Sequence, residues 1–292
     1  MNMFNKICSL LFLAGVLFSC QESEKERISR LVKEWDGKEI VFPDRPVFTI
    51  QGRDTVSCPS GNSPYKVLTY IDSLGCASCK LQLPRWKELM AEVDSVVSGR
   101  VPFLFYFHPK DMKEMRYITR RDGFTYPVCF DEGDELNRLN HFPSEMAFQT
   151  FLLDADNRVV ALGNPVHNPE VKSLYLRLLK GEGEAPVENQ TVTAAELSTA
   201  KVDFGKFPVS EVQSREVVLR NTGNRPLVIH DITTSCGCTR VEYDKRPVAV
   251  GGETSIRIIY EAEHPGHFRK TADVYCNIAA SRLRITVMGA AE

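Results

Sequence analysis

The stretch IDSLGCASCKLQLPRW, residues 71–86, places Cys76 and Cys79 between an apolar run and a segment with helical spacing. A Cys-x-x-Cys at the start of a helix that follows a strand is typical of dithiol–disulfide exchange, because unpaired backbone N–H groups and the helix dipole favour a thiolate on the first cysteine. The second cysteine, one turn further on, can displace a mixed disulfide. Half of a metal site and a purely structural disulfide are the alternatives that the pair leaves open.

The segments around this pair predict an α/β domain. Apolar runs that suit strands alternate with segments of helical periodicity, and the series ends in a hairpin and a helix. Such a series predicts one sheet with helices on its faces. The expected strands are residues 66–72, 101–108, 126–131, 148–154 and 158–163, and the expected helices are residues 81–97, 110–122, 134–142 and 169–181. An amphipathic segment, residues 23–35, predicts a short helix that docks onto the protein.

The strand, the Cys76-Ala-Ser-Cys79 motif and Pro84 inside the following helix resemble the thioredoxin-like proteins. The closest resemblance is to membrane-tethered envelope redoxins with an inserted strand and helix, and it covers roughly residues 40–180. It implies a thioredoxin-like fold in which Cys76 is the attacking thiol, Cys79 is the resolving thiol and Pro84 kinks the helix.

Two positions depart from the family's pattern. Gly75 stands where the family often has a tryptophan before the first cysteine. The family places a cis-proline opposite the dithiol, just before the hairpin strand, where it shapes the substrate groove. Alignment on that strand puts Phe148 at this position, and the nearest proline is Pro143. We therefore expect either that Pro143 serves through a local insertion or that the groove is altered.

The C-terminal third of the sequence has a different residue pattern. Residues 182–198 contain almost no large apolar side chains and indicate a linker. Short alternating segments follow, with turns between them and no helical pattern, which predicts an all-β sandwich. These expected strands are residues 201–207, 215–220, 226–232, 255–262, 270–276 and 282–289. The stretches Ser-Cys-Gly-Cys-Thr and Asn-Thr-Gly-Asn-Arg-Pro-Leu resemble an Ig-like domain of unknown function common in bacterial envelope proteins, over residues 199–292.

This second domain carries the thiols Cys236, Cys238 and Cys276. On a regular strand Cys236 and Cys238 would point to the same side, and a disulfide between them would be easily reduced. Cys276 on a neighbouring strand offers a better partner. The other interpretations are small buried side chains and a copper or zinc site with His264 and His267.

The N-terminal residues predict export. Residues 1–19 combine Lys6 with an apolar core too short to cross a bilayer, and the sequence turns polar directly after Cys20. This resembles a bacterial lipoprotein signal, which implies that Cys20 is lipidated and that residues 20–39 hold the anchor and the short helix. The alternative is an ordinary secretory signal with an incidental cysteine. A location in the cell envelope permits disulfides among the other cysteines.

Together these features predict an α/β thioredoxin-like domain, residues 40–181, followed by an all-β Ig-like sandwich. We expect a membrane-anchored thiol–disulfide oxidoreductase that acts on thiols or disulfides of exported proteins and is recycled by another redox protein. No cofactor and no metal are expected, and the formal net charge of −2 argues against a nucleic-acid partner. The rival is a non-catalytic binding or scaffold lipoprotein with a structural disulfide. A peroxide-reducing enzyme comes third, because Ser73 copies only the spacing of the Thr/Ser-x-x-Cys setting.

Overall fold

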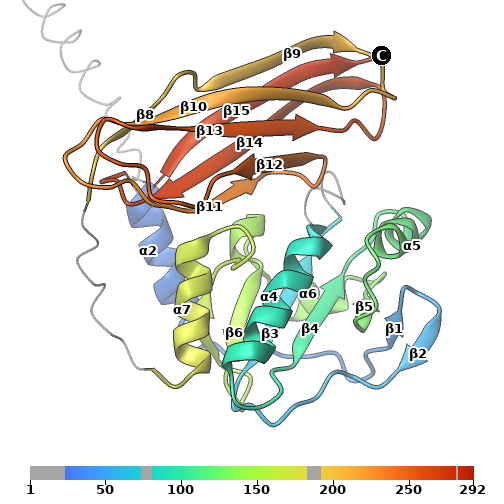
Figure 1. Cartoon of the computed structure of the whole chain (residues 1–292). Coiled ribbons are helices and arrows are strands. Elements are labelled where there is room, and N and C mark those ends of the chain that lie inside the picture. The colour runs from blue at the N-terminus through green and yellow to red at the C-terminus, as the bar shows by residue number, and fades with distance from the viewer. Residues whose placement is uncertain (1–23, 74–80, 183–191, 281) are drawn as a thin grey trace, which may run out of the picture.

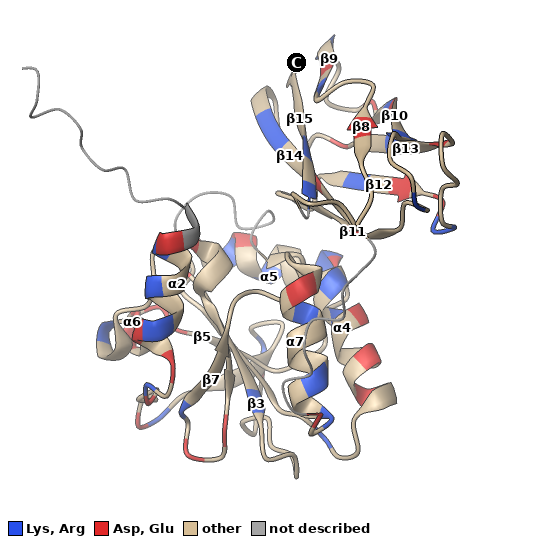
Figure 2. Ribbon diagram, turned by 90° about the vertical axis from the view of Figure 1, so that its left-hand side faces the viewer, with Lys and Arg blue, Asp and Glu red and all other residues tan. Residues whose placement is uncertain are grey.

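The computed structural model describes residues 24–73, 81–182, 192–280 and 282–292. They form an α/β domain and, stacked on one end of it, a β-sandwich (Figure 1). The helices in the view of Figure 2 carry both Lys or Arg and Asp or Glu residues. Among the described residues, no helix combines the length and the apolar character that a bilayer crossing requires.

The α/β domain is built on one mixed sheet of seven strands in the order β2-β1-β5-β4-β3-β6-β7. Strands β3, β4 and β5 are parallel to one another, whereas β6, β7 and the β1–β2 hairpin are antiparallel to their neighbours. Side chains of β3 and β4 are buried on both faces, as near-continuous apolar strands of covered parallel sheets require. The strands are β1 (Phe48–Ile50), β2 (Asp54–Val56), β3 (Lys66–Ile71), β4 (Phe103–Phe107), β5 (Val128–Phe130), β6 (Thr150–Leu153) and β7 (Val159–Leu162).

Helices cover both faces of this sheet, as the alternating sequence pattern predicts. Helices α4, α5 and α7 pack on one face, where Trp86 meets the rings of Phe103 and Phe105. Helices α2 and α6 pack on the other, where Trp35 meets Phe142 and Phe151. The docking helix expected near the N-terminus is therefore α2, which covers part of the α/β core. The helices are α2 (Glu24–Trp35), α4 (Leu83–Val96), α5 (Met112–Arg121), α6 (Glu135–Asn140) and α7 (Pro169–Leu179), with a short 3₁₀ turn, η1 (Met146–Phe148).

Residues 192–280 and 282–292 form two four-stranded sheets, with orders β12-β13-β10-β8 and β11-β14-β15-β9. Apolar side chains alternate inward along β10, β13 and β15, so the all-β prediction is confirmed. The strands are β8 (Ala195–Leu197), β9 (Lys201–Phe207), β10 (Gln213–Asn221), β11 (Ile229–Thr234), β12 (Thr239–Tyr243), β13 (Glu253–Tyr260), β14 (Gly266–Cys276) and β15 (Arg282–Ala291).

Three details of the sandwich differ from the sequence prediction. Strand β12 is not among the expected strands, and only Thr239 of its five residues is buried. Strand β8 lies inside the expected linker. It has only three residues, which leave little apolar signal, and its backbone pairs with β10. The Cys236-Gly237-Cys238 segment is a turn and not part of a strand. It joins β11 in one sheet to β12 in the other, so the chain has to leave regular strand geometry there.

Candidate functional site

The candidate site is centred on the start of α4 and on the sandwich turn that faces it. In the sequence, Cys76 and Cys79 stand between β3 and α4; both lie outside the described residues, as does Cys20. The described chain resumes at Leu81, which is helical.

The start of α4 differs from the expected kinked helix. Gln82 has a left-handed backbone (φ 41°, ψ 43°), and α4 begins at Leu83 with Pro84 in its first turn. A proline inside a helix removes a backbone hydrogen bond and clashes with the carbonyl four residues earlier, whereas in a first turn it costs neither. Pro84 therefore follows an interruption of the helical backbone at Gln82 and does not bend a continuous helix.

The residues expected to shape the substrate groove surround Gln149, which the sequence did not single out. Phe148 is half-buried in η1. The Gln149 side chain donates from Nε2 to the Asp72 carboxylate at 2.9 Å and to the Pro143 carbonyl at 3.0 Å. It thereby ties the end of β3 to the loop before β6. Among the described residues no peptide bond is cis, so Pro143 does not supply the cis-proline of the thioredoxin-like pattern.

Gln149 is also buried, with 2% of its surface exposed. Its Oε1 atom has no hydrogen-bond partner in the part of the chain that the structure describes. The orientation of the amide is set by the two acceptors on Nε2, because an Oε1 atom in that place would face two other oxygens. The sequence gives no signal for this role, because Gln149 falls inside the strand predicted over residues 148–154, whereas β6 begins at Thr150.

The start of α4 binds the sandwich directly. Gln82, which is 5% exposed, donates from its side-chain amide to the carbonyl of Thr234 at the end of β11. Arg85 donates to the Ile232 carbonyl at 3.2 Å and forms an ion pair with Asp231. These contacts hold the first turn of α4 against β11 and the turn that follows it.

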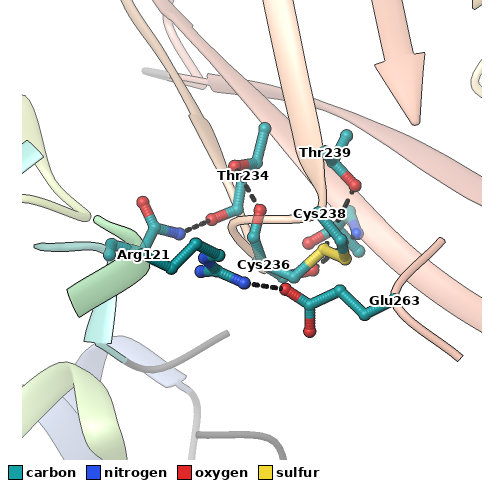
Figure 3. Close-up of a disulfide and its surroundings, with 9 residues drawn as sticks. Arg121, Thr234, Cys236, Cys238, Thr239 and Glu263 are labelled. Atoms are coloured by element: carbon teal, nitrogen blue, oxygen red, sulfur yellow. Dashed lines mark hydrogen bonds and ion pairs between the residues drawn. A yellow bond between two sulfur atoms is a disulfide. The ribbon is translucent and has the colours of Figure 1, made fainter. Parts of the chain in front are cut away.

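A second contact joins the end of α5 to the loop after β13. Arg121 pairs with Asp122 on its own side, at 2.7 Å, and with Glu263 on the sandwich. The hydrogen bond to Asp122, followed by the one to Glu263, raises the pKa of Arg121 above its ordinary value. Figure 3 shows this pair beside the cysteine turn.

Cys236 and Cys238 form a disulfide, with their Cα atoms 5.3 Å apart. Cys236 is fully buried, and its sulfur lies 3.2 Å from the Thr239 hydroxyl (Figure 3). The expectation of two small buried thiols is therefore wrong. Cys276 is not the partner of either cysteine, because it pairs with Ile229 at the far end of β11. Six residues of strand separate Ile229 from Ser235, which is about 20 Å.

A cleft of about 780 Å³ opens between the two domains at this turn. Both domains line it, and acidic and basic side chains alternate around it. Among its lining residues are Pro84, Tyr117 and Arg121 from the α/β domain and Cys238, Arg240 and His264 from the sandwich. Cys238 is half-buried and faces this cleft, whereas Cys236 does not line it.

The alternative of a copper or zinc site does not fit this arrangement. His264 and Cys238 both line the cleft, but the two sulfurs are bonded to each other and are not thiolate ligands. Within the described ranges, no group of three or more His, Cys, Asp or Glu side chains could hold a metal ion.

Three further cysteines of the described chain are unpaired. Cys58 is exposed. Burial, followed by the nearby Asp131 carboxylate, raises the pKa of the Cys129 thiol to about 12, and burial raises that of Cys276 to about 11. Both buried thiols are therefore protonated and unreactive at neutral pH.

The chain thus combines an α/β domain with an all-β domain whose disulfide turn faces the start of α4. The family described as protein of unknown function (DUF1573) matches residues 195–291, which cover the sandwich. A comparison with curated proteins gave no match.

Solved structures resemble parts of the chain at low scores. A protein of unknown function from Porphyromonas gingivalis W83 is 24% identical over 37% of this chain and 51% of its own, with a TM-score of 0.33. The chain thus spans about half the length of that protein. The ASH/PapD-like domain of human CEP192 is 14% identical over 35% of this chain and 87% of its own (TM-score 0.31). A putative electron transfer protein from Aquifex aeolicus VF5 is 13% identical over 50% of this chain and 99% of its own (TM-score 0.35).

Proposed function

We propose that this chain is a membrane-anchored thiol–disulfide oxidoreductase that acts on exported proteins through Cys76 and Cys79. The observation that carries the proposal is the place of the pair in the chain, between β3 and α4. β3 is an inner strand and runs parallel to β4. Sites of open α/β sheets lie outside the carboxyl ends of such strands.

The order of elements supports a thioredoxin-like assignment of the α/β domain. After β3 and α4 the chain continues through β4, α5, β5 and α6, then the β6–β7 hairpin and α7. The hairpin lies beside β3, because β6 pairs with both β3 and β7. This is the order expected for a redoxin with an inserted strand and helix. We accordingly assign Cys76 as the attacking thiol and Cys79 as the resolving thiol.

The lipoprotein-like signal at residues 1–19 supports the place of action. Lipidated at Cys20, the protein would work in the cell envelope on thiols or disulfides of exported proteins. A second redox protein would recycle the Cys76–Cys79 pair.

The test is the redox equilibrium of Cys76–Cys79 in the full chain, read by differential alkylation and mass spectrometry across buffered thiol potentials. A midpoint between about −120 and −270 mV, with Cys76 modified first near neutral pH, is the range of exchange catalysts. A pair that stays oxidised below about −300 mV is a structural disulfide. That result would replace the proposal by the scaffold alternative, in which reduction costs about 2–4 kcal/mol of stability and no turnover occurs.

Turnover gives an independent measurement. Cys76→Ser should abolish disulfide reductase activity, because no attacking thiolate remains. Cys58→Ser is the matched control, since Cys58 is an exposed, unpaired thiol in the same domain and should leave the activity unchanged. Equal activity of both variants would contradict the assignment of Cys76.

A further inference from the structure

The interdomain cleft gives a second molecule access to one sulfur of the Cys236–Cys238 disulfide. Cys238 lines the cleft and is half-buried, whereas Cys236 is fully buried and does not line it. The cleft volume of about 780 Å³ lies within the range of ligand-binding pockets. A thiol that enters the cleft therefore reaches the sulfur of Cys238 before that of Cys236.

The surroundings of Cys236 suit it to leave when Cys238 is attacked. A sulfur in a disulfide carries no proton, so the Thr239 hydroxyl, 3.2 Å from the Cys236 sulfur, is the donor of that contact. A hydrogen bond to an ionised sulfur stabilises the thiolate, which makes Cys236 the better leaving group. The Cys236 carbonyl also accepts from the Thr234 hydroxyl at 3.0 Å and from the Thr239 amide at 3.2 Å, which holds the backbone at the buried cysteine.

The charges around the cleft favour a positively charged ligand. Among the described residues that line it, five carboxylates stand against three Lys or Arg side chains. Arg121 is paired with both Asp122 and Glu263 (Figure 3 shows the pair with Glu263). Arg240 is paired with Glu261 at 3.6 Å. The lining thus keeps a net negative charge, which attracts cations and repels anions.

The first turns of α5 add a place for a Lys or Arg side chain. Glu114 and Tyr117 both line the cleft, and they lie next to each other on the helix surface because they are three residues apart. Glu114 is exposed, and so is 59% of the Tyr117 side chain. A carboxylate beside an open aromatic ring binds an ammonium or guanidinium group through its charge and through the face of the ring.

We propose that Cys236–Cys238 is a redox-active disulfide that accepts two electrons from a pair of cysteine thiols on a basic polypeptide segment bound in the cleft. Glu114 and Tyr117 hold a Lys or Arg side chain of the segment, and one of its thiolates attacks Cys238. The inference goes beyond the proposed function and does not depend on it, because the site consists only of residues of α5 and of the sandwich.

The exchange conserves atoms and electrons. A substrate thiolate attacks the sulfur of Cys238, a bond forms between the two sulfurs, and Cys236 leaves as a thiolate and takes up a proton. The second substrate thiolate then attacks the substrate sulfur of this mixed disulfide, which forms the substrate disulfide and releases Cys238 as a thiol. Two electrons and two protons pass from the substrate dithiol to the cysteine pair.

The first experiment follows this disulfide alone. A full chain with Cys58→Ser, Cys76→Ser and Cys79→Ser is mixed, without denaturant, with a large excess of a reduced peptide whose two cysteines are flanked by lysines. Peptide mapping should show that the Cys236–Cys238 disulfide is lost and that an equal amount of peptide disulfide forms. A disulfide that the peptide reduces only after urea has unfolded the sandwich would overturn the proposal, whatever the redox state of Cys76–Cys79 in the unaltered chain.

A second experiment tests the substrate class. A matched peptide carries glutamates in place of the lysines, and each rate is divided by the rate of the same peptide with neutral 2-hydroxyethyl disulfide, which corrects for differences between the thiols. The lysine peptide should react about ten-fold faster or more at low ionic strength. This advantage should shrink at about 1 M salt, where the Debye length is about 3 Å. Equal corrected rates at low ionic strength would overturn the assignment of a basic substrate.

Glu114 has a matched control in the other helices. Glu114→Gln should slow the lysine peptide by about two- to five-fold, the range of an exposed ion pair. Glu170 is also an exposed glutamate in the first turn of its helix, α7, but does not line the cleft, so Glu170→Gln should leave the rate unchanged. Equal effects of the two substitutions would contradict a binding role for Glu114.

The roles of the two sulfurs and of Thr239 have separate readouts. With Cys236→Ser the remaining thiol of Cys238 should react with the oxidised lysine peptide about ten-fold faster or more than the thiol of Cys236 does with Cys238→Ser; equal or reversed rates would overturn the order of attack. Thr239→Val should slow reduction of the intact disulfide about ten-fold or more, as expected for a lost hydrogen bond to a charged group, and Thr239→Ser should keep the rate. Equal rates in the two Thr239 variants, at matched urea midpoints, would contradict the leaving-group role.

Discussion

Replacing Arg85 by Met should loosen the contact between the two domains. The substitution removes the ion pair between Arg85 and Asp231 and the 3.2 Å hydrogen bond from Arg85 to the Ile232 carbonyl. About a quarter of each charged side chain is exposed, 26% for Arg85 and 22% for Asp231, so solvent screens the pair in part. Asp231 also keeps a 2.8 Å hydrogen bond from the Ile232 amide after the change. We expect a loss of about 1–2 kcal/mol of interface free energy.

The assay can separate the domains by probe. Both tryptophans of the chain, Trp35 and Trp86, lie in the α/β domain, so their fluorescence follows that domain alone in urea. Hydrogen exchange in β11 follows the sandwich. The interface is lost when the less stable domain unfolds. In Arg85→Met the urea midpoint of that transition should fall by about 0.5–1 M, for an m-value of about 2 kcal/mol/M.

A double-mutant cycle tests the reasoning. Arg85→Met and Asp231→Asn should be non-additive by at least about 0.5 kcal/mol, because the two side chains contact each other. The control is Arg257→Met, which removes an exposed arginine paired with Glu216 inside the sandwich and should cost less than about 0.5 kcal/mol. Additive effects of Arg85→Met and Asp231→Asn would refute the conclusion that this ion pair stabilises the contact between the two domains.

Three other predictions follow from single side chains. Gln149→Met should lower the urea midpoint of the fluorescence transition by the equivalent of about 1–3 kcal/mol, since the bonds to the Asp72 carboxylate and a backbone carbonyl are lost; an unchanged midpoint would contradict this. Gly223→Ala should disrupt the sandwich, because an added Cβ would lie 2.4 Å from the Ala194 amide nitrogen, whereas Gly133→Ala meets nothing within 4 Å and should be neutral by circular dichroism. The raised pKa of Cys276, about 11 against 9.0, means that the unfolded chain loses this proton first, so stability is full below about pH 9 and falls as pH rises to about 11. Cys276→Ala should flatten that decline in urea titrations, and an unchanged slope would count against burial as its cause.

The periodicity of apolar residues predicted most of the helices and strands. It failed where the structure depends on which strands pair with each other. β3 and β4 are recognisable because both of their faces are buried and nearly all their residues are apolar. β8 escaped notice because it has only three residues: Ala195 and Leu197 pack against the sandwich core and the backbone pairs with β10, but so short a strand shows no alternation. The break at Gln82 was equally hidden, since residues on both sides of it continue the helical spacing.

The candidate site was predictable only in part. The Cys-x-x-Cys motif carries its own signal, but the role of Gln149 depends on three segments that meet only in the fold. The Cys236–Cys238 disulfide required knowing that the chain changes sheets at this turn, which the alternation of β11 and β12 does not reveal. The contact between that turn and Gln82 joins residues 152 positions apart, beyond the reach of local patterns.

The parallel pairing of β9 with β15 has a consequence for the order of folding. Lys201, in the second strand of the sandwich, lies opposite Thr286 in the last strand. Loop closure over that separation is slow, and the sheet cannot be completed until the final segment has been synthesised. The α/β sheet, whose strands all lie within residues 48–162, can form earlier. Nascent chains should therefore carry a finished α/β domain beside an open sandwich, and the interdomain cleft should be the last part of the molecule to take shape.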